Sequence, residues 1–307
     1  LVTVELTLND QQYTSDGVHF EYEAVVLHTI EPRTGPVRGG SAVTLFGGRI
    51  HAPGAEGLFC KFAGAPAVGA TRDSEEVVRC STPASLDAGR VAVRLINNDA
   101  VYAATVAFEY LPVASVSSIE PPVGLLAGST QLRVRGAGFL PAASAFCRIG
   151  THRVVVARVV SSSLLECQTP SHTVAELLSV EVSLNGLDYG DDGVLFEYQS
   201  AASVAEVSPS KGPVEGGTLV NATGSGFAAR SAALSYLRVR FGTVTVPVVW
   251  VSTSELRVVA PEHSASLVTV ELTLNDQQYT SDGVHFEYEA VVLHTIEPRT
   301  GPVRGGS

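Results

Sequence analysis

An exact internal repeat is the feature that most constrains how this chain can fold. Residues 1–41 and residues 267–307 are identical at every position, at an offset of 266 in a chain of 307 residues. Diverged sister domains do not keep such identity, so a recent duplication, an engineered cassette and a window on a longer periodic chain are the possible origins. We expect a long, regularly repeated rod, which either continues covalently or is completed by strand donation between copies.

A shorter, diverged repeat lies inside the 266-residue period. The triplet Phe-Glu-Tyr begins at Phe20, Phe108, Phe196 and Phe286, with spacings of 88, 88 and 90 residues. A Pro- and Gly-rich segment follows each triplet, and such periodicity is typical of a row of similar domains. The repeat predicts the end of one domain at 1–23, complete domains at 24–112, 113–199 and 200–289, and the start of another at 290–307.

Each unit has the sequence pattern of short β-strands. Apolar side chains alternate with polar ones from Val2 to Leu8, which is the period of a strand with one buried face. Turn-forming residues follow at 9–17, and alternation resumes from Val18 to Tyr22, so the segment predicts a hairpin. No amphipathic helix of ten or more residues is visible. Some seven short strands in about 88 residues predict a small immunoglobulin-like sandwich.

Three motifs recur at matched places in the units. They are Pro-x-x-Gly-Pro-x-x-Gly-Gly at 32–40, Gly-x-Gly-Phe at 136–139 and 224–227, and Cys-x-Thr-Pro at 80–83 and 167–170. The first unit departs from the second motif, with Gly47-Gly48-Arg49-Ile50. Together these motifs resemble the IPT/TIG family. The resemblance implies an all-β chain of tandem immunoglobulin-like (IPT/TIG) β-sandwich domains arranged as a rod.

The family resemblance leaves several functions open. Tandem IPT/TIG arrays resemble the ectodomains of plexins, hepatocyte-growth-factor-type receptors, fibrocystin-like proteins and large microbial surface proteins. The same fold also occurs in Rel-type transcription factors and beside polysaccharide-degrading enzymes, so the fold alone does not decide function.

Four cysteines occupy matched places in the first two units. The pairs are Cys60 with Cys80 and Cys147 with Cys167, each separated by 20 residues. In the third unit, Val239 and Val259 align with these places, so both cysteines are missing together. We predict one disulfide in each of the first two units, contributing roughly 3 kcal/mol apiece, and an extracellular or cell-surface location. Four buried free thiols are the alternative.

Two further surface features come from the predicted strand faces. Asn221-Ala222-Thr223 is an N-glycosylation sequon, and strand alternation points Asn221 towards solvent, so we predict a glycan there. A chance match is the alternative. Phe46 falls on the outward face of its strand, where the sister units carry Arg135 and Thr223. We therefore predict a contact surface at Phe46, with an error in strand register as the alternative.

Composition and spacing argue against the other functional classes. A net charge of −11 disfavours nucleic-acid binding. No apolar run is long enough to insert into a membrane. The loop carrying Asn185, Asp188, Asp191 and Asp192 is rich in oxygen ligands, but it lacks the spacing of a calcium loop and favours a turn. No metal or cofactor is therefore predicted.

Catalytic residues are not apparent in the sequence. The histidines at 28, 51, 152, 172 and 263 are scattered, with no matching Ser or Asp constellation, so we predict a protein that is not an enzyme.

The predicted function is structural. Rigid domains with short connections favour an extracellular fibril, filament or surface appendage that assembles with itself through end-to-end and lateral packing and carries covalent glycans. The alternative is the ectodomain stalk of a receptor or adhesin that binds a protein or glycan partner.

Overall fold

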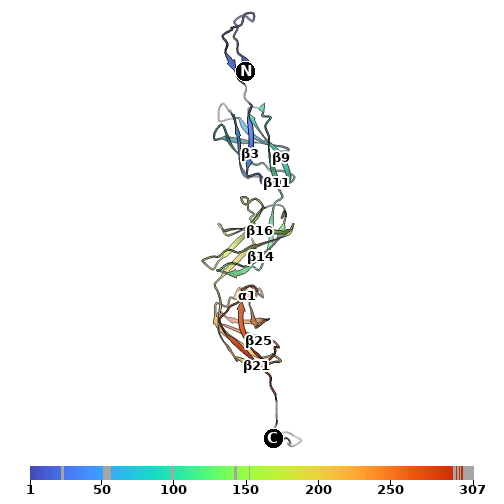
Figure 1. Cartoon of the computed structure of the whole chain (residues 1–307), viewed down its shortest axis with the longest axis vertical. Helices are drawn as coiled ribbons and strands as arrows, with labels where there is room; N and C mark the ends of the chain where they lie inside the picture. The colour runs from blue at the N-terminus through green and yellow to red at the C-terminus, as the bar shows by residue number, and fades with distance from the viewer. Residues whose placement is uncertain are drawn as a thin grey trace.

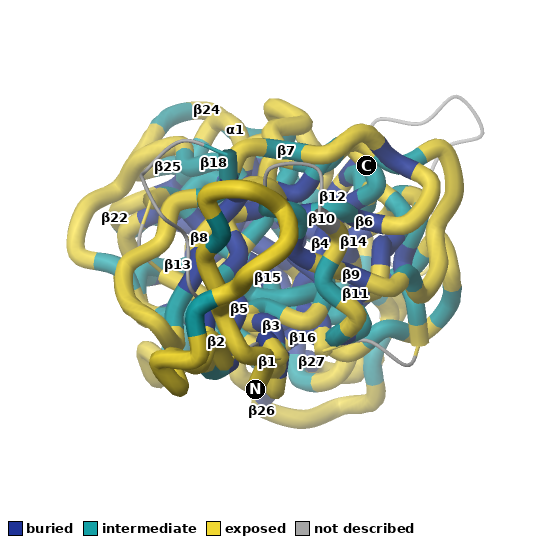
Figure 2. The backbone as a smooth tube through the Cα atoms, turned by 90° about the horizontal axis from the view of Figure 1, so that it is seen from above, coloured by how far each residue is buried: buried dark blue, intermediate teal, exposed yellow. Residues whose placement is uncertain are grey.

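The computed structural model is an extended row of three β-sandwiches with a separate hairpin at its N-terminal end (Figure 1). It describes residues 1–21, 24–50, 57–97, 100–141, 144–151, 153–292, 295, 297 and 299. Most of the segment 290–307, predicted to start a further domain, therefore lies outside the described residues. Viewed down the row, the buried segments lie within an exposed periphery (Figure 2).

The N-terminal hairpin is made by residues 1–21. Its strands are β1 (Val2–Thr3) and β2 (His19–Phe20), paired antiparallel.

The first sandwich is formed by strands β3–β11. These are β3 (Val26–Glu31), β4 (Thr34–Pro36), β5 (Ala42–Gly48), β6 (Leu58–Phe62), β7 (Ala67–Arg72), β8 (Val77–Ser81), β9 (Gly89–Asn97), β10 (Ala100–Val101) and β11 (Val106–Leu111). Their order is β3-β5-β8-β7-β6-β9-β11-β4, with β10 paired to β9.

The second sandwich repeats this order. Its strands are β12 (Ser115–Glu120), β13 (Val123–Leu125), β14 (Gln131–Ala137), β15 (Ala145–Ile149), β16 (Arg153–Ser161), β17 (Leu164–Gln168), β18 (Leu177–Ser183) and β19 (Leu195–Gln199).

The third sandwich has the same topology with one short helix added. It consists of β20 (Ser203–Ser208), β21 (Lys211–Pro213), β22 (Leu219–Ser225), α1 (Ala229–Ala233), β23 (Arg238–Phe241), β24 (Val244–Ser252), β25 (Glu255–Val259), β26 (Ser266–Thr273) and β27 (His285–Glu289). The all-β immunoglobulin-like fold predicted from the sequence is confirmed.

The recurring Phe-Glu-Tyr triplet anchors each core. Phe108 and Tyr110 are buried while Glu109 between them is exposed, as the alternation of a strand requires. The Tyr110 hydroxyl donates to the Pro83 carbonyl at 2.8 Å, and Tyr198 makes the same bond to Pro170. Burial raises the pKa of Tyr110 to about 12, so the hydroxyl stays protonated as a donor. The triplet thus ties the last strand to the Thr-Pro segment.

The glycines after each triplet let two loops approach closely. Gly39 has φ 73°, and a Cβ there would lie 2.6 Å from the Pro83 carbonyl carbon. Gly128 and Gly216 repeat this against Pro170 and Pro261. Since a side chain is excluded at these positions, the Gly-Gly and Thr-Pro motifs are two halves of one contact.

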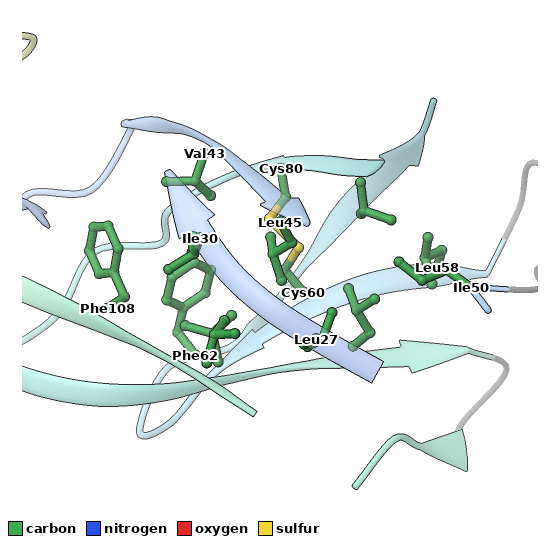
Figure 3. Packing of buried hydrophobic residues seen from close by; sticks show 14 of the residues in the cluster. Leu27, Ile30, Val43, Leu45, Ile50, Leu58, Cys60, Phe62, Cys80 and Phe108 are labelled. Atoms are coloured by element: carbon green, nitrogen blue, oxygen red, sulfur yellow. A yellow bond between two sulfur atoms is a disulfide. The ribbon is translucent and has the colours of Figure 1, made fainter. Parts of the chain in front are cut away.

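Both disulfides predicted from the sequence are present in the structure. Cys60–Cys80 and Cys147–Cys167 each join Cα atoms 6.5 Å apart. Figure 3 shows the first bond packed among Leu45, Val43 and neighbouring core side chains.

The place of the second cysteine in the third sandwich differs from the sequence alignment. Val258, not Val259, pairs with Val220 as Cys80 pairs with Val43, and Val258 is buried while Val259 is 53% exposed. The turn between β23 and β24 has two residues where the corresponding turn between β15 and β16 has three. The 20-residue spacing therefore does not carry over to the third sandwich.

A third disulfide can be introduced at the corrected position. The double variant Val239→Cys/Val258→Cys should oxidise spontaneously and raise the stability of the third sandwich by about 3 kcal/mol on the loop-closure model. Thiol titration and thermal unfolding with and without reductant would measure this. The matched control is Val239→Cys/Val259→Cys, whose second side chain faces solvent and should leave two free thiols. Bond formation in the control but not in the first pair would contradict the register.

The three buried tyrosines should respond unequally to loss of the hydroxyl. Tyr110→Phe and Tyr198→Phe each leave a proline carbonyl without its donor and should destabilise their sandwiches by about 1 kcal/mol. Tyr288→Phe is the control, because the Tyr288 hydroxyl is buried without a hydrogen-bond partner among the described residues. Denaturant unfolding of the three variants should show no loss for Tyr288→Phe. If all three variants lost the same stability, the hydrogen bond of the tyrosine hydroxyl would contribute nothing to the stability of the sandwiches.

Candidate functional site

The junctions between successive sandwiches are where the chain concentrates its long-range polar contacts. At each junction, a closing loop between the last two long strands of one sandwich meets a receiving segment of the preceding sandwich. The closing loops are residues 184–194 and 274–284, and the receiving segments are residues 34–41 and 123–131. Residues 211–219 are the corresponding segment of the third sandwich.

At the first junction, three hydrogen bonds join the closing loop to the first sandwich. The Ser41 hydroxyl donates to Asp188 Oδ2 at 2.8 Å. Asn185 Nδ2 donates to the Thr34 carbonyl at 3.0 Å, and Arg38 Nη2 donates to the Tyr189 carbonyl at 3.0 Å. Ser41 is only 3% exposed, so its hydroxyl is taken out of water and satisfied across the junction.

The second junction repeats the arrangement with amide side chains. Asn275 Nδ2 donates to the Thr130 hydroxyl at 3.1 Å, and that hydroxyl lies 3.4 Å from Gln278 Oε1. Gln277 forms a pair of bonds with the backbone of Gln131, accepting from its N–H at 2.8 Å and donating to its carbonyl at 2.9 Å. Gln278 Nε2 also donates to the Ser129 carbonyl at 3.0 Å. The receiving hydroxyl of Thr130 is fully buried.

Helix α1 adds a second set of contacts to this junction. Arg230 forms an ion pair with Glu197 at 2.8 Å, and the buried Ser231 hydroxyl donates to Gln199 Oε1 at 2.7 Å. Burial raises the pKa of Tyr236, and the nearby carboxylates of Glu120 and Asp276 raise it further. Glu120 of the second sandwich and Asp276 of the third therefore both lie close enough to Tyr236 to act on its hydroxyl.

Each closing loop is held in shape from within its own sandwich. Asn185 Oδ1 accepts from the backbone N–H groups of Leu187 and Asp188 at 3.0 and 2.9 Å, an Asx turn that presents its amide outward. The guanidinium of Arg148 lies 4.0 Å from the centre of the Tyr189 ring and is hydrogen-bonded to Glu181. Arg240, Tyr279 and Glu271 repeat this arrangement. The loops are thus preorganised for docking.

The junctions combine tight contacts with wider clefts. A cleft of about 620 Å³ at the first junction is lined by Thr34, Leu140 and Asn185, and one of about 440 Å³ at the second is lined by Tyr198 and Ala228. A pocket between Pro36, Leu111, Val182 and Leu184 at the first junction has a cavity volume of about 20 Å³, which is room for roughly one water molecule. Direct packing around this small pocket and the hydrogen bonds beside it join the first two sandwiches.

The acidic loop predicted to form a turn does form one. Asp188 bonds across the junction, and Asp192 Oδ2 accepts from the Val116 N–H at 2.8 Å. Within the described ranges, no group of three or more His, Cys, Asp or Glu side chains is placed to hold a metal ion. The residue pattern predicted only a turn for this loop, and its contact with the neighbouring sandwich was not predicted. The asparagine shared by positions 9, 185 and 275 was the sequence feature that could have pointed to this contact.

The predicted glycosylation and contact sites lie on outer sheet faces. Asn221 lies opposite the buried Val220 and Ala222, but it is half-buried and its Nδ2 donates to Glu255 at 3.1 Å. Phe46 lies on the face opposite Val43 and Leu45 and is also half-buried. A glycan on Asn221 and a contact at Phe46 stay predictions.

The histidines are dispersed among the sandwiches. His172 packs on the Tyr198 ring and contacts Glu176 at 2.7 Å, while His263 stacks on Tyr288. His28 is exposed, and the positions 51 and 152 lie outside the described residues.

Among the helices that the structure describes, none has the length and apolarity needed to cross a membrane.

Comparison with known families identifies the repeated unit. The IPT/TIG domain model matches residues 114–198 and 202–288, which together exceed half of the chain. The chain belongs to the IPT/TIG domain family. The first sandwich shares the strand order of the two matched IPT/TIG domains.

Relatives of this IPT/TIG chain include two kinds of large protein. Human Plexin-A2 is 29% identical over 176 residues, covering 55% of the chain and 9% of Plexin-A2. Human Fibrocystin-L is 32% identical over 127 residues, covering 40% of the chain and 3% of Fibrocystin-L. The chain thus spans less than a tenth of the length of either relative.

A solved structure of the Plexin A4 extracellular region matches 92% of the chain and 35% of its own length, at 15% identity and a TM-score of 0.36. The family assignment rests on the family model and not on this superposition. The two disulfides and the plexin relatives place this chain outside the cell or at its surface.

The buried hydroxyl at the second junction can be tested by an isosteric change. Thr130→Val leaves the Asn275 amide without its acceptor across the junction, so it should weaken the contact between the second and third sandwiches by about 1–3 kcal/mol. Residual dipolar couplings should show wider motion between the two sandwiches. In thermal unfolding, the two sandwiches should no longer unfold in a single transition.

The matched control is Thr218→Val, the same position in the third sandwich, against which no following sandwich lies among the residues that the structure describes. The control should leave interdomain motion unchanged. Equal effects of the two variants would show that the hydroxyl acts within its own sandwich and not across the junction.

Proposed function

We propose that this chain is part of the extracellular stalk of a receptor or adhesin. The observation that carries the proposal is that successive domains are joined by hydrogen-bonded, preorganised junctions in place of flexible linkers. Such joints resist bending and hold whatever lies beyond them at a set distance. Disulfides inside the first two sandwiches add resistance to unfolding.

The sequence relatives support a stalk better than the fibre that was the main prediction from the sequence. Plexins and Fibrocystin-L are large proteins of which this chain matches only a small share. In this proposal the chain has no catalytic role and positions partner-binding regions. We also propose that the stalk serves the binding of protein or glycan partners and that the chain itself carries glycans.

The stalk function predicts a measurable height above a surface. The chain would be anchored by its C-terminal end to a supported bilayer and carry a fluorescent protein at its N-terminal end. We expect a narrow distribution of heights, because the joints limit bending. Axial interference microscopy would measure the distribution.

The variant that tests this arrangement is Ser41→Ala/Thr130→Val, which removes the receiving hydroxyl of both junctions. It should broaden the height distribution and lower its mean. The control is Thr44→Ala/Thr218→Val, which also removes two hydroxyl groups but away from the two junctions. A broad distribution for the unmodified chain would refute the stalk. Growth of its mass into long polymers on native light scattering would favour the fibre.

A further inference from the structure

The outer sheet face of the third sandwich carries an apolar groove. Leu219 is 61% exposed, Val249 is 65% exposed and Val259 is 53% exposed. These side chains lie on three adjacent strands, because β25 pairs with β22 on one side and with β24 on the other. Together with Pro247 they line a groove of about 470 Å³. Such a surface leaves a patch of apolar side chains in water unless another group covers it.

The matching positions of the first two sandwiches are polar or small. Leu219 pairs with Val259 across β22 and β25. The corresponding pairs are Ala42 with Ser81 in the first sandwich and Gln131 with Gln168 in the second. All four of these residues are exposed even though another sandwich follows theirs, so contact between successive sandwiches does not cover this face. The apolar groove is therefore a property of the third sandwich itself.

The neighbouring row of side chains across the sheet differs in the same way. In the second sandwich this row is Arg133, Glu166 and Arg158, in which Glu166 forms ion pairs with both arginines. In the third sandwich the row is Asn221, Arg257 and Val249. Asn221 begins the one N-glycosylation sequon in the sequence. The sequon and the apolar groove thus occur together, on the same face of the same sandwich.

We propose that Asn221 carries an N-linked glycan whose two innermost N-acetylglucosamine residues lie in this groove. In the attachment step, Asn221 Nδ2 bonds to C1 of the first sugar of a lipid-linked diphosphate donor. The C1–O bond to the diphosphate breaks, the diphosphate leaves with the electron pair, and the amide loses one proton.

The distances on the sheet suit a glycan that folds back. Neighbouring strands lie about 4.8 Å apart, so Val249 is about 10 Å from Asn221 across β25. Two linked pyranose rings are long enough to span this distance. Their C–H faces and acetyl methyl groups supply apolar surface to the groove, while their hydroxyl groups stay in water.

The contacts of Asn221 leave the groove side free for the sugar. Asn221 Nδ2 donates to Glu255, which lies opposite Thr223, on the side of Asn221 away from Leu219. A glycosylated amide nitrogen keeps one hydrogen, so this bond can persist while the sugar extends towards Leu219. Arg257 lies opposite Asn221 with its side chain 54% exposed, and its guanidinium can donate to sugar hydroxyl groups. The covering of the groove rests on the glycan that we propose for this chain and is independent of the stalk function.

Hydroxyl-radical footprinting of the whole chain, secreted from eukaryotic cells, tests this arrangement. Intact mass reports whether Asn221 is occupied. The radicals oxidise exposed aliphatic side chains, so Leu219, Val249 and Val259 should be oxidised at least about threefold more slowly with the glycan than without it. Val156 is the internal control, because it is 78% exposed on the outer face of the second sandwich and should be oxidised equally in both forms.

The matched variants are Thr223→Ala and Thr223→Ser. Both shorten the same side chain, but only Thr223→Ala destroys the sequon. Thr223→Ser should resemble the unmodified chain in mass and in protection, whereas Thr223→Ala should lack the glycan and lose the protection.

Three outcomes would overturn the proposed covering. An unoccupied Asn221 would remove both the covering and the glycan at this residue. Occupancy with equal oxidation in the two variants would leave the glycan in place but refute its position in the groove. Protection that persists in Thr223→Ala, with a doubled mass on light scattering, would assign the groove to a second copy of the chain. None of these outcomes alters the heights expected for the stalk.

Discussion

A buried hydroxyl at the start of one strand connects the inside of each domain to the next domain. Ser41 and Thr130 lie against Gly35 and Gly124, where a Cβ would come within 2.6 and 2.4 Å of the hydroxyl oxygen. On their other side, the same oxygens meet the closing loop of the following sandwich. One small polar group therefore requires a glycine in its own domain and an asparagine-containing loop in its neighbour. The end-to-end arrangement of the sandwiches follows because this buried hydroxyl needs a hydrogen-bond partner.

This constraint explains why motifs far apart in the sequence recur together. The Gly-Gly turn must approach the Thr-Pro carbonyls, and the tyrosine of Phe-Glu-Tyr donates to the same proline carbonyl in the first two sandwiches. The ends of each sandwich are thus built from backbone contacts that tolerate little change in side-chain size. The closing loops can vary between Asp188 and Gln278, because the receiving groups are a hydroxyl and backbone atoms.

The fold could be predicted from the sequence because its signals are local or periodic. Alternation along strands, the spacing of Phe-Glu-Tyr and the paired cysteines each reflect a contact that repeats with the domain. The junctions could not be predicted, since Asn185 and Asp188 are ordinary turn residues until the neighbouring domain is placed beside them. The error at Val259 has a similar origin. A one-residue change in a turn leaves strand propensity intact but moves the inward-facing position to Val258.

The outer-face positions show a different limit. Asn221 was correctly assigned to the face opposite the core, but sequence alternation does not reveal its bond to Glu255 on the adjacent strand. Alternation gives the side of a sheet, whereas accessibility depends on which side chains flank a residue. Phe46 is half-buried for the same reason, since Thr29 and Val77 lie opposite it on the two neighbouring strands.

The uneven distribution of disulfides has a mechanical consequence. When the ends of such a chain are pulled apart, a bond such as Cys60–Cys80 keeps the residues between the two cysteines from extending. The third sandwich has no such bond among its described residues, so it should yield at the lowest force. It would also release its whole length, at up to about 3.4 Å per residue. A rod of this composition contains its own extensible element, which lengthens under load while the clamped domains on its N-terminal side keep their fold.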